Sequence, residues 1–126
     1  MCDDHFEPPL SSYVNIQEYG KKLSSKAINF EAWHKNKLIG LVSVYFNDTT
    51  NKIAFISNVS IEAGYQSKGI ASLLLKMVTD YGIGLEFSSL QLEVQSKNIK
   101  AVNLYKKMGF REEKTCKEKL VMTKNL

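Results

Sequence analysis

Hydrophobic and polar residues alternate with a period of two along three stretches in the first half of the chain, and this alternation predicts β-strands. The stretches are residues 28–34, 38–46 and 52–61. Polar turns at 36–37 and 47–51 separate them, so we expect an antiparallel meander. In the third stretch the alternation assigns five residues to one face: Ile53, Phe55, Ser57, Val59 and Ile61.

The period then changes to that of an amphipathic helix. The apolar positions that define its face are Ile70, Leu73, Leu74, Met77, Val78 and Tyr81. We expect this helix to start near Gly69 and to end at the glycine-rich residues 82–84. A strand over 89–95 follows, and a right-handed crossover makes it parallel to the strand over 52–61.

The last third of the chain predicts one more helix and two closing strands. The helix spans 98–108 and buries Ala101, Leu104, Tyr105 and Met108, and the strands span 110–116 and 119–124. A short helix over 16–26 is expected near the start. The fold class is therefore α+β, a mixed and mostly antiparallel sheet with helices on both faces, in one domain over residues 1–126.

The charge and composition of the chain limit the kinds of ligand and partner that it is expected to bind. The net charge of +4 suits an anionic ligand. The lysines are scattered, however, and no basic helix appears, so no nucleic-acid partner is expected. The chain has no apolar run of 18 residues and begins with a polar, acidic segment, so we expect neither a membrane span nor a secretion signal, and a cytoplasmic location.

The segment from Glu62 to Gly69 joins the third strand to the helix and has the character of an anion cradle. The first turn of a helix carries unpaired N–H groups, and Gly64 and Gly69 permit tight bends with no Cβ in the way. Phosphate or diphosphate is the expected ligand, bound through backbone amides without a metal. A P-loop would need Lys and then Ser or Thr after the second glycine, but Ile70 and Ala71 stand there.

Two motifs resemble those of the GNAT superfamily of acetyl-CoA-dependent N-acetyltransferases. Residues 66–71, Gln-Ser-Lys-Gly-Ile-Ala, resemble its Gln/Arg-x-x-Gly-x-Gly/Ala signature. Residues 98–110 resemble its Asn-x-x-Ala-x-x-Leu-Tyr-x-x-x-Gly-Phe segment. The resemblance covers residues 28–126 well and 1–27 poorly. It implies a three-layer fold whose two central parallel strands splay apart, with the pantetheine arm of acetyl-CoA in the gap.

The resemblance also implies how the cosubstrate is held. Backbone groups near Val59 and Ile61 would pair with the pantetheine arm, and an N–H near Val59 would polarise the acetyl carbonyl. The implied cofactor-binding residues are Val59, Ser60, Ile61, Gln66, Ser67, Lys68, Gly69, Ile70, Ala71, Ser72 and Asn98. Three of them have an alternative interpretation, since Lys68 and Ser72 suit solvated surface positions and Asn98 suits a helix N-cap.

Tyr105 is the implied general acid, which would protonate the departing CoA thiolate. A core tyrosine on the buried helix stripe is the alternative. The general base is not visible, because the strand over 52–61 contains no carboxylate. Glu31, His34, Glu62 and Glu93 are candidates by residue type, although Glu31 and His34 lie on opposite faces of their strand. A water relay or an amine that arrives neutral would also serve.

The resemblance predicts transfer of an acetyl group from acetyl-CoA to a primary amine. A non-catalytic domain that senses acyl-CoA, and an acetyltransferase for protein N-termini or lysines, are the alternatives. A small-molecule amine is slightly favoured over a protein amine. Specificity is expected from residues 5–35 and 117–118, which carry no readable motif. Dimers are frequent in the family, so a homodimer remains open.

Overall fold

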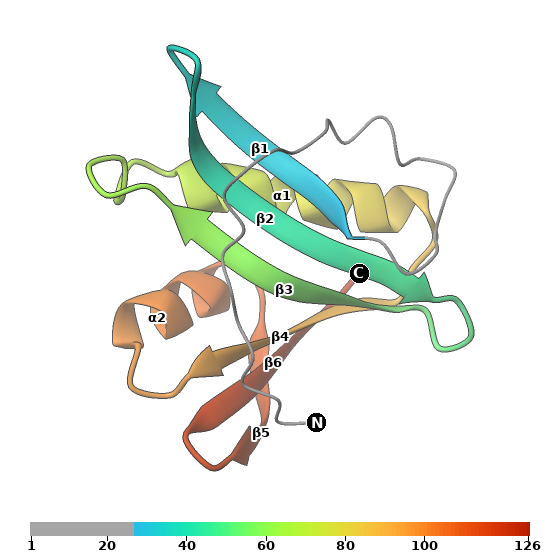
Figure 1. The fold of residues 1–126 in the computed structure, drawn as a ribbon. Coiled ribbons are helices and arrows are strands. Elements are labelled where there is room, and N and C mark those ends of the chain that lie inside the picture. The colour runs from blue at the N-terminus through green and yellow to red at the C-terminus, as the bar shows by residue number, and fades with distance from the viewer. Residues whose placement is uncertain (1–26) are drawn as a thin grey trace.

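A mixed sheet carries the fold. The computed structural model describes residues 27–126, which form a six-stranded sheet and two helices (Figure 1). The elements are β1 (Ile28–His34), β2 (Lys37–Asp48), β3 (Ile53–Ile61), α1 (Ile70–Gly84), β4 (Ser89–Gln95), α2 (Ile99–Lys107), β5 (Arg111–Cys116) and β6 (Lys119–Asn125). The strand order is β1-β2-β3-β4-β6-β5, and only β3 and β4 are parallel. The predicted mixed, mostly antiparallel sheet with a central parallel pair is confirmed.

Both described helices pack against one face of this sheet. Tyr81 of α1 meets Phe30 of β1 and Phe46 of β2 edge-on, at centroid distances of 5.6 and 5.3 Å. Val102 and Tyr105 of α2 belong to the same hydrophobic cluster as these residues. The predicted helix over 16–26 lies outside the described residues. Within residues 27–126, no helix is long and apolar enough to cross a membrane.

A β-bulge in β3 changes which of its residues face the helices. Ser43 pairs with Asn58 and Val44 with Ile56, so Ser57 is an extra residue. The predicted single stripe is therefore wrong for the first half of the strand. Before the bulge the buried residues are Ala54 and Ile56, and after it Val59 and Ile61 pack against the core.

The buried face of α1 also differs from the predicted stripe. Leu73 and Met77 are 58% and 40% exposed, and the buried residues are Leu74, Leu75, Val78 and Gly82. Apolar residues occupy most positions of this helix, so several stripes fit its sequence and packing decides between them. The helix also continues through Gly82, where a Cβ would come within 2.8 Å of Leu126 Cδ1.

The turns also differ by a residue or so from those predicted. The β1–β2 turn is formed by Lys35 and Asn36, both left-handed, rather than by residues 36–37. β2 extends to Asp48, whose Oδ1 accepts the N–H of Asn51 at 3.0 Å. At the far side of the sheet, β5 is an edge strand, and its residues 111–115 are exposed.

Candidate active site

The two central strands separate halfway along their length. β3 and β4 pair from Ile53 with Ser89 to Ile56 with Leu92, and no further pair follows. Residues 57–61 keep β2 as a neighbour, and residues 93–95 keep β6. Backbone groups on the two facing edges therefore lack a ladder partner within the described chain. This is the splayed arrangement that the sequence resemblance implies.

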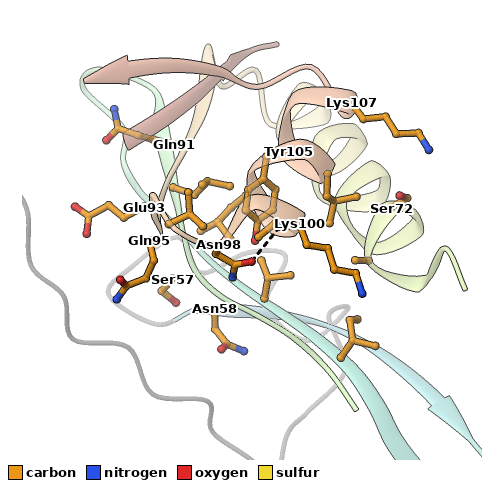
Figure 2. Close-up of a pocket in the computed structure, with 18 of the residues that line it drawn as sticks. Ser57, Asn58, Ser72, Gln91, Glu93, Gln95, Asn98, Lys100, Tyr105 and Lys107 are labelled. Atoms are coloured by element: carbon orange, nitrogen blue, oxygen red, sulfur yellow. Dashed lines mark hydrogen bonds between the residues drawn. The ribbon is translucent and has the colours of Figure 1, made fainter. Parts of the chain in front are cut away.

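A cleft of about 1190 Å³ occupies the gap and continues between α1 and α2 (Figure 2). Its volume suits a ligand larger than a typical small-molecule substrate. Lys100 and Lys107 of α2 extend on the same side of Tyr105 as Ser72 of α1. Gln91, Glu93 and Gln95 of β4 lie on the other side. The cleft is thus lined by lysines on the side of the helices and by polar side chains of mixed charge on the side of β4.

The glycine loop forms one end of the cleft. Gly69 is the N-cap of α1 with φ +81°, and it makes no side-chain cap hydrogen bond. Its carbonyl accepts the N–H of Leu73 at 3.0 Å, so the N–H groups of residues 70–72 precede the first helical hydrogen bond. Gln66 Nε2 donates to the Ile61 carbonyl at 3.2 Å and ties the loop to the end of β3. This geometry suits an anion.

Most of the predicted cofactor-binding residues come together in this cleft. Those that line it are Val59, Ile61, Gln66, Ser67, Gly69, Ile70, Ala71, Ser72 and Asn98. Ser60 and Lys68 are not among the lining residues. Lys100 and Lys107 also line the cleft and were not predicted from the sequence, although both fall within the second motif. Their positions carry no motif letter, so only the helix geometry reveals them.

Asn98 is the N-cap of α2, since its Oδ1 accepts the N–H of Ala101 at 3.2 Å. This confirms the capping interpretation of Asn98. The same residue lines the cleft, so its capping role leaves room for a contact with a ligand. On α2 the buried residues are Val102 and Tyr105, while Ala101, Leu104 and the C-cap residue Met108, which were predicted to be buried, are only partly so.

Tyr105 lies inside the cleft and in the core at once. It is 7% exposed, packs edge-on against Phe110 at 5.9 Å and lines the cleft. Burial raises the pKa of the Tyr105 phenol to about 12. The phenol is therefore fully protonated at neutral pH, as a general acid must be, although the raised pKa also makes it a weaker acid than an exposed tyrosine.

Of the four base candidates, only Glu93 lines the cleft. Glu31 accepts a hydrogen bond from Trp33 Nε1 at 2.9 Å, and Glu62 forms an ion pair with Lys37 at 3.6 Å. The Nδ1 of His34 is 3.0 Å from the hydroxyl of Tyr65. None of these three residues lines the cleft, although Tyr65, the partner of His34, does.

Two further polar residues of the cleft carry no sequence motif. Glu113 of β5 accepts hydrogen bonds from Thr123 Oγ1 and, at 3.4 Å, from Gln91 Nε2. The bond from Thr123 is the main reason why the pKa of Glu113 is lowered. Asn58 of β3 is only 3% exposed, and its Oδ1 accepts the hydroxyl of Ser60 at 2.9 Å. Strand pairing brings these residues to the cleft from distant parts of the sequence.

The family model of the acetyltransferase (GNAT) family matches residues 2–110. The chain belongs to the GNAT acetyltransferase family. The predicted enzyme class, an acyltransferase that uses acetyl-CoA, is confirmed at the level of the family.

Two curated GNAT relatives show the range of this similarity. Streptothricin acetyltransferase of Escherichia coli is 28% identical over 127 residues, which cover 86% of this chain and 72% of the relative. Spermidine N(1)-acetyltransferase of Escherichia coli strain K12 is 31% identical over 109 residues, which cover 83% of this chain and 58% of the relative. The chain thus spans little more than half of the second enzyme.

A solved GNAT structure has the same arrangement of elements. The acetyltransferase of the GNAT family from Streptococcus pneumoniae superposes with a TM-score of 0.73 at 25% identity. The superposition covers 87% of this chain and 71% of that one. The shared fold therefore covers most of this chain.

Proposed function

We propose that this GNAT domain transfers the acetyl group of acetyl-CoA to a primary amine of a small molecule. The observation that carries the proposal is the gap between β3 and β4, with Tyr105 at its side. The amine nitrogen attacks the thioester carbonyl, a C–N bond forms and the C–S bond breaks. The thiolate takes the proton of Tyr105, and the proton lost by the amine leaves to a base.

Acetyl-CoA binding is expected to follow the cleft from the loop to the gap. The diphosphate would accept hydrogen bonds from the backbone amides of residues 66–71 and from the Ser72 hydroxyl. Lys68 is proposed as a point charge, and Lys100 and Lys107 add positive charge to the lining. The pantetheine amides would pair with backbone groups near Val59 and Ile61, with Ser60 between them, and Asn98 would contact the same arm.

An N–H near Val59 is proposed to bind the acetyl oxygen. The carbonyl oxygen gains negative charge as the amine attacks, and a fixed N–H stabilises that charge. Loss of such a donor typically lowers the rate by a factor of about 100 or more. The absence of a β4 partner beyond Ile56 supports this role, since it leaves edge groups of β3 open to a ligand.

Glu93 is proposed as the general base. Of the four candidates it alone borders the cleft, and it lies on β4 beyond the last pair with β3, where the gap has opened. A carboxylate that accepts a proton directly or through one water contributes about 10²–10⁴ in rate.

The acceptor is proposed to be a small amine. The two curated relatives described above are named for streptothricin and spermidine, both small molecules, and this supports the slight preference that the sequence suggests. A protein N-terminus or lysine stays the alternative, because the NatC complex bound to Gag peptide and CoA is among the structures with this fold. A homodimer also stays a prediction, which sedimentation would test.

The first experiment compares thermal midpoints with acetyl-CoA, with ATP and without ligand. A ligand at about 100 times its dissociation constant adds roughly 2.7 kcal/mol, which corresponds to a midpoint shift of about 5–10 °C. A shift with acetyl-CoA alone supports the cleft as the cosubstrate site. The amine panel then follows with detection of the released thiol. Binding without thiol release over a broad panel would favour the non-catalytic acyl-CoA sensor.

A further inference from the structure

Asn58 carries a buried hydrogen-bond donor that has no partner among residues 27–126. The residue is 3% exposed and lines the cleft. Its Oδ1 accepts the Ser60 hydroxyl at 2.9 Å, whereas its Nδ2 has no partner in the described structure. Buried polar groups are nearly always paired, because an unpaired donor costs free energy. A donor left open in a ligand cleft points to a ligand atom that completes it.

The position of Asn58 indicates which ligand that is. Because Ser57 is the extra residue of the bulge, the side chains of Ile56 and Asn58 point to opposite faces of the sheet. Val59, which follows Asn58, packs against the core under the helices. Asn58 therefore faces the opposite side of the sheet, the side of Gln91 and Glu93 (Figure 2). It lies two residues beyond the last β3–β4 pair, where the gap opens.

The two substrates of the proposed reaction approach this gap from different sides. The phosphates of acetyl-CoA are expected at the glycine loop, at the N-terminus of α1. The amine has to reach the acetyl carbon from the face that α1 and α2 leave open, where Glu93 also lies. Asn58 is on that face, which makes the amine substrate the ligand best placed to supply the missing acceptor atom.

We propose that Asn58 is a specificity-determining residue whose Nδ2–H group donates a hydrogen bond to an oxygen of the acceptor molecule. The substrate class is a primary amine that also carries a hydroxyl, carboxamide or carboxylate oxygen. This inference deepens the proposed function and rests on it. It separates this domain from enzymes that act on polyamines such as spermidine, which contain no oxygen.

The physical basis is the penalty for leaving Nδ2 unpaired. A site built to hydrogen-bond a substrate group discriminates strongly against an analogue without that group, since the buried partner then stays unsatisfied. We expect the wild-type domain to prefer the oxygen-bearing member of a matched pair by at least about tenfold. The pairs are primary amines with two to six carbons that end in a hydroxyl or carboxamide, against amines of equal length that end in a methyl group.

The main variant is Asn58→Leu, which keeps the number and branching of the side-chain heavy atoms and removes the donor. The preference should fall close to one, with the dissociation constant of acetyl-CoA unchanged. Asn58→Asp is the second variant, since it retains the acceptor for Ser60 and lacks the N–H group. Ser43→Ala is the matched control, because it removes a hydroxyl from the β2 residue that pairs with Asn58, outside the cleft, and leaves Nδ2 in place, so most of the preference should remain.

Two readouts keep the inference separate from the proposed reaction. Thiol release gives kcat/KM ratios for the paired amines, and calorimetry gives their dissociation constants for the CoA-loaded domain. If acetyl-CoA binds but no amine is acetylated, the proposed function fails, while the binding ratios still test Asn58. Equal binding of both members by wild type, no amine binding at all, or an undiminished preference in Asn58→Leu overturns the inference. Weakened acetyl-CoA binding in Asn58→Leu assigns Nδ2 to the cosubstrate instead.

Discussion

Ile56 of β3 and Leu92 of β4 form the last pair of the central parallel strands. Both side chains are buried in the core shared by the two helices, so the strands are firmly joined up to this point. Beyond it the strands diverge, and the cleft begins. The cleft is therefore built into a packed sheet, which favours a preformed site over one that closes around its ligand.

Replacing Tyr105 with Phe should lower kcat and leave acetyl-CoA binding nearly unchanged. The substitution removes the proton donor and keeps the ring that packs against Phe110. A general acid contributes about 10²–10⁴ in rate, so turnover should fall by roughly that factor. Steady-state thiol release and calorimetry with acetyl-CoA measure the two effects. Unchanged turnover across the pH range would remove Tyr105 from the mechanism.

The same residue should govern part of the alkaline stability. Its pKa is raised from 10 to about 12 in the folded state by burial. Below pH 10 the phenol is protonated in both the folded and the unfolded state, so its raised pKa does not change the free energy of unfolding. Between pH 10 and 12 the unfolded state loses the proton first, so the free energy of unfolding should drop by about 2–3 kcal/mol.

Denaturant titrations of wild type and Tyr105→Phe at several pH values isolate this contribution. The difference in unfolding free energy between the two proteins should change only above pH 10, in favour of the variant. Equal alkaline slopes would mean that the phenol ionises in the folded domain as easily as in the unfolded chain.

Replacing Gly69 with Ala should affect both stability and cosubstrate affinity. Gly69 has φ +81°, a conformation that costs an L-residue roughly 1–2 kcal/mol. The added methyl group meets no protein atom within 4 Å, so it points into open space at the N-terminus of α1. There it would obstruct the diphosphate, and we expect the dissociation constant of acetyl-CoA to rise about tenfold, or about 1.4 kcal/mol.

Gly64→Ala is the matched control for this prediction. Gly64 has φ +94° and equally open surroundings, but it is not among the residues that line the cleft. It should lose a similar amount of stability and keep its affinity. Equal losses of affinity in both variants would point to general strain in the loop rather than to a phosphate contact.

Replacing Glu93 with Gln should lower kcat by about 10²–10⁴ through loss of the proposed base. The defect should shrink at high pH, because more of the amine, with a pKa near 10.4, is then neutral before it binds. Glu62→Gln is the control, since Glu62 is paired with Lys37 outside the cleft. A pH-independent defect would indicate a structural role for Glu93.

The sequence could predict the parts of the site that depend on local patterns. The glycine loop, the start of α1 and the position of Tyr105 on α2 each follow from a short segment, and the structure contains these elements where expected. The parallel pairing of β3 and β4 could also be predicted, because two strands joined by a crossover helix usually lie parallel in one sheet, with a right-handed connection.

Features that depend on the pairing between strands could not be predicted from the sequence. The bulge at Ser57 shifts the alternation within β3, and nothing in the residues 52–61 marks it. Glu113 reaches the cleft only because β5 and β6 add to β4 in the order β4-β6-β5. Its partners Gln91 and Thr123 are 22 and 10 residues away. Such contacts arise from tertiary structure and leave no local period.

The exposed edge strand β5 has a consequence for self-association. An unpaired strand edge offers its backbone to any other strand, and proteins commonly protect such edges with charged side chains. The exposed residues Arg111, Glu112, Glu113 and Lys114 place four charges in succession along β5. A second sheet that docked there would have to strip water from them. Edge-to-edge aggregation is thereby disfavoured, and a homodimer is expected to form through another surface.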